Sequence, residues 1–122
     1  MSLLEQLESE KYISVETFKK SGDGIKTPVW FVIRDETIFV VTRDQTGKFK
    51  RLKNNTKVNL AICSMKGDIK GEWFSGIATI LPEEQVKEAV KWRDKKYGFL
   101  AKIAKFASKS KGELCAFSIK LD

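Results

Sequence analysis

The residues best suited to chemistry lie in one short segment, TRDQTGKFKR at positions 42–51. Thr42 ends an apolar run typical of a β-strand, and Lys48 and Arg51 stand three residues apart in a segment predicted to be helical. A strand-ending hydroxyl, the unpaired N–H groups of a helix start and two cations at this spacing can all reach one anion. The segment therefore predicts a phosphate site built without a glycine-rich loop.

The chain contains no histidine. Ser-His triads, histidine-bound zinc or iron and histidine general bases are therefore excluded. No metal site is predicted, and no protein side chain is identified as catalytic. Any reaction is expected to depend on a bound cofactor.

Positive charge is concentrated in two regions of a chain whose net charge is +7. Residues 43–57 hold six Lys and Arg against one acid, and residues 86–111 hold nine against two. This distribution indicates two cationic surfaces. For the second region, lysines on solvated helix faces are the alternative interpretation.

Length and composition favour one domain, residues 1–122, because 42% hydrophobic residues can form a sizeable core. No stretch approaches the roughly 20 apolar residues of a membrane span, and the first residues are acidic where a signal peptide is basic. We expect a cytoplasmic protein that does not cross a membrane. Cys63 and Cys115 are expected to be buried thiols in a reducing compartment.

Alternating apolar residues and turn signals predict about six strands. The predicted strands are 12–18, 27–34, 37–42, 58–62, 70–81 and 115–121. Helices are expected over 47–54, from Pro82 to about Tyr97 and over 99–107, with a turn or two of helix within 2–10. This order predicts a mainly β fold, a small antiparallel split β-barrel with helices packed outside.

The motifs and their order resemble the pyridoxamine 5'-phosphate oxidase-like family of FMN- and deazaflavin-binding split barrels. Within that family the chain is similar to the small coenzyme F-420-dependent enzymes. The residues that carry the resemblance are Tyr12 with Thr17, Thr27–Phe31, Thr42 with Gly47-Lys48-x-x-Arg51-Leu52, Val58 with its strand, and Gly71-x-Trp73-x-x-Gly76-x-Ala78.

The resemblance implies a cofactor site and a homodimer with cofactors at its interface. It implies that the cofactor phosphate lies against Thr42, Lys48 and Arg51. The ring would lie along the strand segment Thr27, Pro28, Val29 and Trp30. Trp73 is a further candidate contact, although core packing or a subunit interface would also explain it.

The implied activity is hydride transfer between coenzyme F-420 and an unidentified organic acceptor, so the resemblance implies an oxidoreductase. In that case the second cationic region could receive the acidic tail of the deazaflavin. The chain lacks the histidine and arginine residues that true pyridoxamine-phosphate oxidases use for substrate, so synthesis of pyridoxal phosphate is not expected.

Three alternatives remain open at this stage. FMN could occupy the same site, since the same cations would hold its phosphate. The fold could carry a cofactor without turnover, although the missing histidine disfavours haem with a proximal histidine. A small basic barrel with Trp30, Phe31, Phe39 and Phe49 could also be an OB-like stacking platform for nucleic acid. These aromatic residues lie mostly within apolar strands, which makes nucleic acid the weaker choice.

Overall fold

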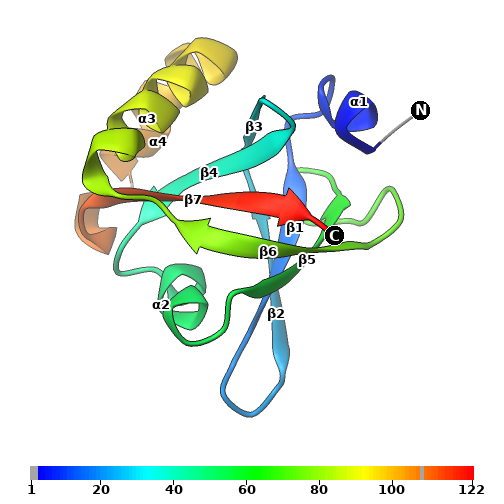
Figure 1. The fold of residues 1–122 in the computed structure, drawn as a ribbon. Coiled ribbons are helices and arrows are strands. Elements are labelled where there is room, and N and C mark those ends of the chain that lie inside the picture. The colour runs from blue at the N-terminus through cyan, green and yellow to red at the C-terminus, as the bar shows by residue number, and fades with distance from the viewer. Residues whose placement is uncertain (1–2, 108) are drawn as a thin grey trace.

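A seven-stranded antiparallel sheet curls into a half-barrel in the computed structural model, which describes residues 3–107 and 109–122 (Figure 1). The strands are β1 (Ile13–Phe18), β2 (Gly24–Val29), β3 (Val32–Arg34), β4 (Thr37–Arg43), β5 (Lys57–Ile62), β6 (Phe74–Ile80) and β7 (Leu114–Leu121). The helices are α1 (Leu3–Leu7), α2 (Gly47–Asn54), α3 (Glu83–Tyr97) and α4 (Phe99–Ala107), and a 3₁₀ turn, η1, spans Lys109–Lys111. The predicted mainly β split barrel with outer helices is confirmed.

The strand order β2-β1-β5-β6-β7-β4-β3 leaves β2 and β3 as the two edges of the sheet. These edges are consecutive in the chain and are separated only by Trp30 and Phe31. The prediction of one continuous strand over 27–34 was therefore wrong, and the sheet has seven strands rather than about six. The chain bends at Trp30 and Phe31 because it passes there from one edge of the half-barrel to the other.

The other boundaries agree more closely with the sequence. The 19–24 turn joins β1 to β2 in antiparallel register, with Val15 opposite Thr27. Asp35 and Glu36 form the tight turn before β4, and both have positive φ, 49° and 61°, as the favoured two-residue hairpin turn requires. The predicted strand 70–81 is shorter and begins at Phe74, so Trp73 precedes it.

Helix α3 follows Pro82, which lies just before the helix with extended backbone. Proline was expected at the first helical position, and Glu83 occupies that position instead. Glu83 and Glu84 in the first turn still suit the positive end of the helix dipole. The predicted helices over 47–54 and 99–107 are confirmed.

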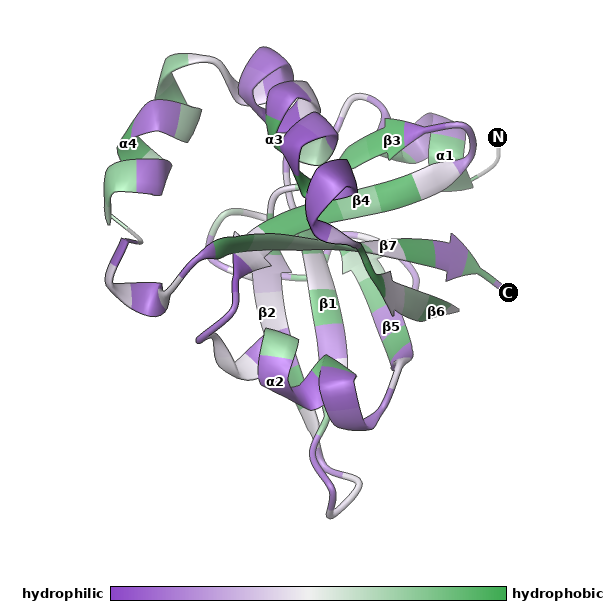
Figure 2. Ribbon diagram, turned by 60° about the vertical axis from the view of Figure 1, so that its left-hand side comes forward, coloured by the Kyte–Doolittle hydropathy of each residue, from purple (hydrophilic) through white to green (hydrophobic). Residues whose placement is uncertain are grey.

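The core fills the concave side of the half-barrel. Ile13, Val15, Val40, Leu60 and Phe117 are at most 1% exposed and come from four different strands. In Figure 2, β3, β4 and β7 are largely hydrophobic and α3 is mostly hydrophilic. None of the helices within the described ranges combines the length and apolar character needed to cross a membrane.

Candidate functional site

A pocket of about 360 Å³ lies where the exit of β4, the first turn of α2 and the end of β2 meet. This volume lies within the range of small-molecule sites in proteins. Its lining combines apolar and cationic side chains: Tyr12, Pro28, Val29, Trp30, Val41, Thr42, Arg43, Thr46, Lys48, Arg93, Ala104, Lys111 and Leu114. No carboxylate belongs to this lining. The pocket is therefore suited to a ligand that joins an apolar body to an anionic group.

The apolar wall is formed by Pro28, Val29 and Trp30 at the end of β2 and the bend that follows it. The Trp30 ring stacks on Tyr97, with centroids 4.3 Å apart and planes 6° from parallel. A stacked partner reduces the freedom of the indole ring. The wall is thus held in place from behind by α3.

Tyr97 also forms hydrogen bonds with backbone groups at the gap between the two edge strands. Phe31 N–H donates to Tyr97 Oη at 3.0 Å. The Tyr97 hydroxyl donates to Lys11 O at 2.8 Å, with Phe31 O also within 3.1 Å. Burial raises the pKa of Tyr97 to about 12, so the hydroxyl stays protonated at neutral pH. These contacts take the place of the strand pairing that is missing between β2 and β3.

The polar end of the pocket is built around Thr42 and Lys48. Lys48 Nζ lies 3.5 Å from Thr42 Oγ1, which in turn lies 3.3 Å from Thr46 Oγ1. Thr46 donates its hydroxyl to Arg43 O at 2.8 Å and does not cap the first N–H groups of α2. Thr46 and Lys48, at the start of this eight-residue helix, both line the pocket.

Burial lowers the pKa of Lys48, and the nearby charge of Arg51 lowers it further. A phosphate beside Lys48 would favour the charged ammonium and would offset both effects. Such a cluster of partly buried cations without a facing carboxylate is typical of an anion site.

Arg51 lies beside the pocket rather than in its lining. Its Nε donates to Thr17 Oγ1 at 2.7 Å, and Thr17 is fully buried. The guanidinium also lies along the first turn of α2, since a Cβ placed on Gly47 would stand 2.7 Å from Arg51 Nη1. Arg51 is thus near Lys48 and also bound to the barrel.

The structure brings most of the predicted site residues together. Pro28, Val29, Trp30, Thr42 and Lys48 line the one pocket. Thr27 is in β2, half-buried and outside the lining. Trp73 also lies outside it, 37% exposed, with Lys26 Nζ 5.0 Å from its ring centroid.

Several lining residues could not be selected from the sequence. Arg43 and Thr46 belong to the TRDQTGKFKR segment, but nothing in their spacing distinguished them. Arg93 and Lys111 come from regions far along the chain and reach the pocket only through the packing of α3 and η1. The one sequence feature that pointed to Arg93 and Lys111 was the excess of cations over residues 86–111.

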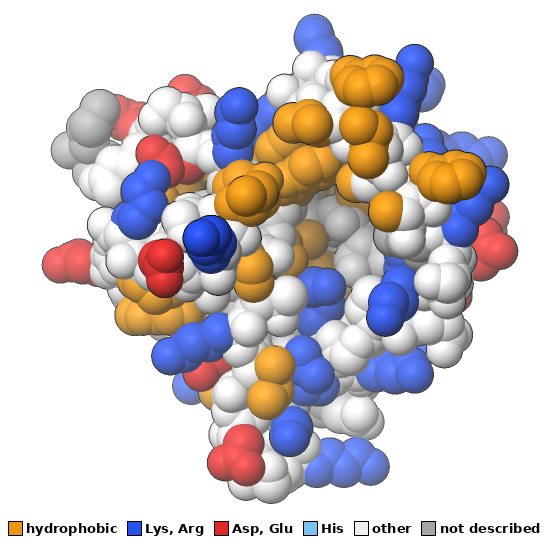
Figure 3. Space-filling model, turned by 180° about the vertical axis from the view of Figure 1, so that it is seen from behind, with side chains coloured by type: hydrophobic (Ala, Val, Ile, Leu, Met, Phe, Trp, Pro, Cys, Tyr) orange, Lys and Arg blue, Asp and Glu red, His pale blue; other side chains and the backbone are white. Residues whose placement is uncertain are grey.

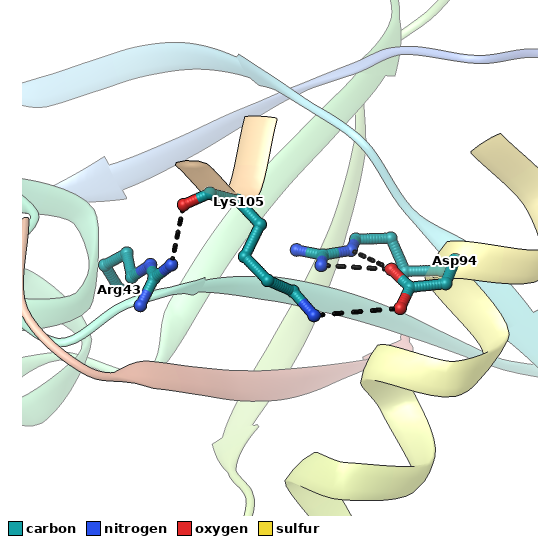
Figure 4. A network of polar contacts seen from close by, with 4 residues as sticks. Arg43, Asp94 and Lys105 are labelled. Atoms are coloured by element: carbon teal, nitrogen blue, oxygen red, sulfur yellow. Dashed lines mark hydrogen bonds and ion pairs between the residues drawn. The ribbon is translucent and has the colours of Figure 1, made fainter. Parts of the chain in front are cut away.

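Arg43 and Arg93 are both buried, at 8% and 6% exposure. Arg43 donates to Gly112 O and Lys105 O, each at 3.0 Å, and so ties the end of β4 to α4 and to the connection between η1 and β7. Arg93 donates to Asp94 Oδ1, and Lys105 Nζ lies 3.8 Å from Asp94 Oδ2 (Figure 4). This network holds α4 beside the pocket.

Among the described residues, no group of three or more His, Cys, Asp or Glu side chains could hold a metal ion. Cys63 is buried and Cys115 half-buried, and both are free thiols. Burial raises the pKa of Cys115 to about 11, so it is not a reactive thiolate at neutral pH.

Comparisons with known proteins agree with this architecture. The family model described as pyridoxamine 5'-phosphate oxidase matches residues 2–122. A search of curated proteins found no significant match.

Solved structures of similar fold include an F420 reductase, with a TM-score of 0.73 and 16% identity over 100% of this chain and 94% of that one. A haem storage protein, HutZ of Vibrio cholerae, has a TM-score of 0.72 and 14% identity over 98% of this chain and 87% of that one. The conserved hypothetical protein Rv2991 of Mycobacterium tuberculosis has a TM-score of 0.73 and 17% identity over 99% of this chain and 81% of that one. At these identities the likeness shows the fold alone.

Proposed function

Because the chain belongs to the pyridoxamine 5'-phosphate oxidase family, we propose that it is an oxidoreductase that holds coenzyme F-420 in the pocket between β2, β4 and α2. The observation that carries this proposal is the division of one pocket into an apolar wall and a carboxylate-free cationic end. A ring would lie against Pro28, Val29 and Trp30. The phosphate of its tail would lie between Thr42, Lys48 and the first turn of α2.

The residues present fit such a group. Trp30 offers a flat face that Tyr97 holds in place. Lys48 is already partly desolvated, and the lowering of its pKa would be relieved by an anion. Arg51 adds charge beside it without entering the pocket, and Lys111 extends the positive lining, whereas the charge of Arg93 is paired with Asp94.

When bound, the cofactor ring supplies the hydride chemistry, for which no protein nucleophile is needed. The part of this chain is to bind and orient the ring, to hold the phosphate and to keep water from the apolar wall. The acceptor is proposed to be a small organic molecule. A homodimer with the cofactor at the subunit interface is also part of the proposal.

FMN is the second candidate, because its phosphate would meet the same cations and its ring the same wall. Carriage of a cofactor without turnover would use the same residues. The name of the F420 reductase of similar fold supports the deazaflavin as the first choice.

The test is a fluorescence titration of the purified protein with coenzyme F-420 and FMN separately, beside haemin and a single-stranded oligonucleotide. We expect saturable binding of F-420. Lys48→Met should weaken that binding at least about tenfold, because a charge-assisted bond to phosphate is lost. Lys50→Met is the matched control, since Lys50 is exposed on the same helix and outside the pocket.

Tight FMN binding without F-420 binding would assign the site to the flavin. Binding of neither, or equal losses in the Lys48 and Lys50 variants, would contradict the proposed site.

A further inference from the structure

A second pocket, of about 360 Å³, lies between β3, the last turns of α3 and the residue that follows α1. Three of its lining residues are cations, namely Arg34, Lys95 and Lys96. Glu8 is the one carboxylate of the lining, and Trp92 forms part of its apolar wall. This lining shares no residue with the pocket between β2, β4 and α2. The cofactor proposed for that pocket therefore leaves the second one unexplained.

Positive charge alone does not identify a site in this protein. Figure 3 shows Lys and Arg side chains over much of one face, with fewer Asp and Glu side chains among them. The cations of the second pocket differ because, within the described ranges, none of Arg34, Lys95 and Lys96 forms an ion pair with a carboxylate. A small anion that enters the pocket would meet cations that are not already paired.

The Arg34 guanidinium is held against the apolar wall of the second pocket. Its Cζ lies 5.3 Å from the centroid of the Trp92 ring, and its Nη1 donates to Ile33 O at 2.9 Å. A guanidinium has more N–H groups than this one bond uses, so others remain to donate to a ligand. A planar group that is fixed in this way is well suited to bind phosphate.

Lys96 is less solvated than an ordinary surface lysine. Its Nζ lies 3.6 Å from the centroid of the Phe31 ring and donates to Phe31 O at 2.9 Å. Burial lowers the pKa of Lys96 to about 8, so a large share of the molecules carry a neutral amine there at pH 8. The neutral amine is the nucleophilic form of lysine, and desolvation is one way in which proteins activate it.

The second pocket thus combines a nucleophilic amine with cations suited to phosphate. A reagent that carries an electrophilic carbon and a phosphate in one small molecule would fit both features. We propose that Lys96 is a site of acylation by small acyl phosphates, whose phosphate group binds to Arg34 and Lys95. A pocket of this volume is large enough to hold acetyl phosphate whole.

The reaction is a transfer of the acyl group and needs no oxidant or reductant. The lone pair of Lys96 Nζ attacks the acyl carbon, and a C–N bond forms. The bond between this carbon and the phosphate oxygen breaks, and inorganic phosphate leaves with the electron pair and takes up the proton that the amine loses. The amide product keeps one N–H, which can donate to Phe31 O as the amine did.

The first test incubates the purified full chain with acetyl phosphate at pH 8, without added cofactor, and follows each lysine by peptide mass spectrometry. We expect acetylation at Lys96 to be at least about tenfold faster than at Lys91, because the Lys96 amine is desolvated. Lys91 is the internal control, since it is exposed on the same helix and lies outside the second pocket. Inorganic phosphate, added at constant ionic strength, should slow the reaction at Lys96 and not at Lys91.

The second test separates phosphate binding from the reactivity of the amine. Arg34→Gln should slow acetylation of Lys96 by acetyl phosphate at least about fivefold, because a charge-assisted contact to the phosphate is lost. The same variant should slow acetylation by the N-hydroxysuccinimide ester of acetic acid less than about twofold, because this reagent carries no phosphate. Lys87→Gln should change neither rate, since Lys87 is exposed on α3 outside the second pocket. Circular dichroism checks that each variant is folded.

Three outcomes would overturn the inference. The first is acetylation of Lys96 that is no faster than that of Lys91. The second is a rate at Lys96 that inorganic phosphate leaves unchanged, a measurement on the wild type that does not depend on the folding of any variant. The third is an equal loss with both reagents in Arg34→Gln, which would show that Arg34 does not bind the phosphate.

Discussion

Trp30 stacks on Tyr97 at the point where the half-barrel fails to close, with ring centroids 4.3 Å apart. The two residues come from the bend between the edge strands and from the last turn of α3. Tyr97 accepts the Phe31 N–H with its hydroxyl and supports the Trp30 ring with its face. One side chain therefore stabilises the gap in the sheet and the apolar wall of the pocket.

Tyr97→Phe separates these two roles. The ring stack is kept, but the buried Phe31 N–H loses its acceptor, so we expect a loss of about 1–3 kcal/mol in the free energy of unfolding. Chemical denaturation measures this loss. An unchanged stability would show that the Tyr97 hydroxyl does not replace strand pairing.

Arg51→Met and Lys48→Met should differ in stability while both weaken binding of the phosphate-bearing cofactor. Arg51→Met leaves the buried Thr17 hydroxyl without its donor, and we expect a cost of about 1–3 kcal/mol. Lys48→Met removes a desolvated charge and should cost little. Replacing both residues together is expected to abolish binding of the cofactor. Fluorescence titration measures this binding, after circular dichroism has shown that the double variant is folded.

Gly76→Ala should disturb the pairing of β6 with β7. A Cβ at Gly76 would lie 2.7 Å from the backbone oxygen of Lys120 and 3.0 Å from Ile119 Cγ2. We expect a loss of about 1–3 kcal/mol, since backbone must shift to accept the methyl group. Gly71→Ala is the control: its Cβ would meet Ile62 at 3.8 Å, an ordinary contact, and should change stability by less than about 0.5 kcal/mol. Thermal unfolding measures both variants. Equal losses of stability in Gly76→Ala and Gly71→Ala would show that close contact between β6 and β7 at Gly76 is not the cause.

Lys96 should make stability depend on pH. Burial lowers its pKa from 10.5 to about 8, while its Nζ donates to Phe31 O at 2.9 Å. Between these values the unfolded chain binds more protons than the folded one, so this contribution to stability rises with pH. The free energy of unfolding of the wild type, minus that of Lys96→Met, should therefore increase with pH from about pH 8 upward.

Denaturation at a series of pH values tests this expectation. Subtracting the Lys96→Met curve removes the effects of Tyr97 and Cys115, whose raised pKa values act in the opposite direction at high pH. A flat difference between pH 8 and 10 would show that Lys96 keeps its ordinary pKa.

Local signals predicted most elements because each depended on neighbours in the chain. Asp35-Glu36 and the 19–24 segment were recognisable as turns, and the 47–54 helix followed from its position after Thr42. The strand over 27–34 was misjudged because its apolar run continues through the bend. Only pairing with different neighbours, β1 on one side and β4 on the other, divides it at Trp30 and Phe31.

The sequence by itself determined the apolar pattern of the barrel, the concentration of cations and the short spacing of Thr42, Lys48 and Arg51, since these depend on residue type and on neighbours in the chain. Tertiary structure alone decided that Tyr97 supports Trp30, that Arg93 and Lys111 join the pocket, that Arg51 lies beside it and that Trp73 lies outside. These relationships join groups tens of residues apart, and only the folded sheet with its packed helices brings such groups within hydrogen-bonding or stacking distance.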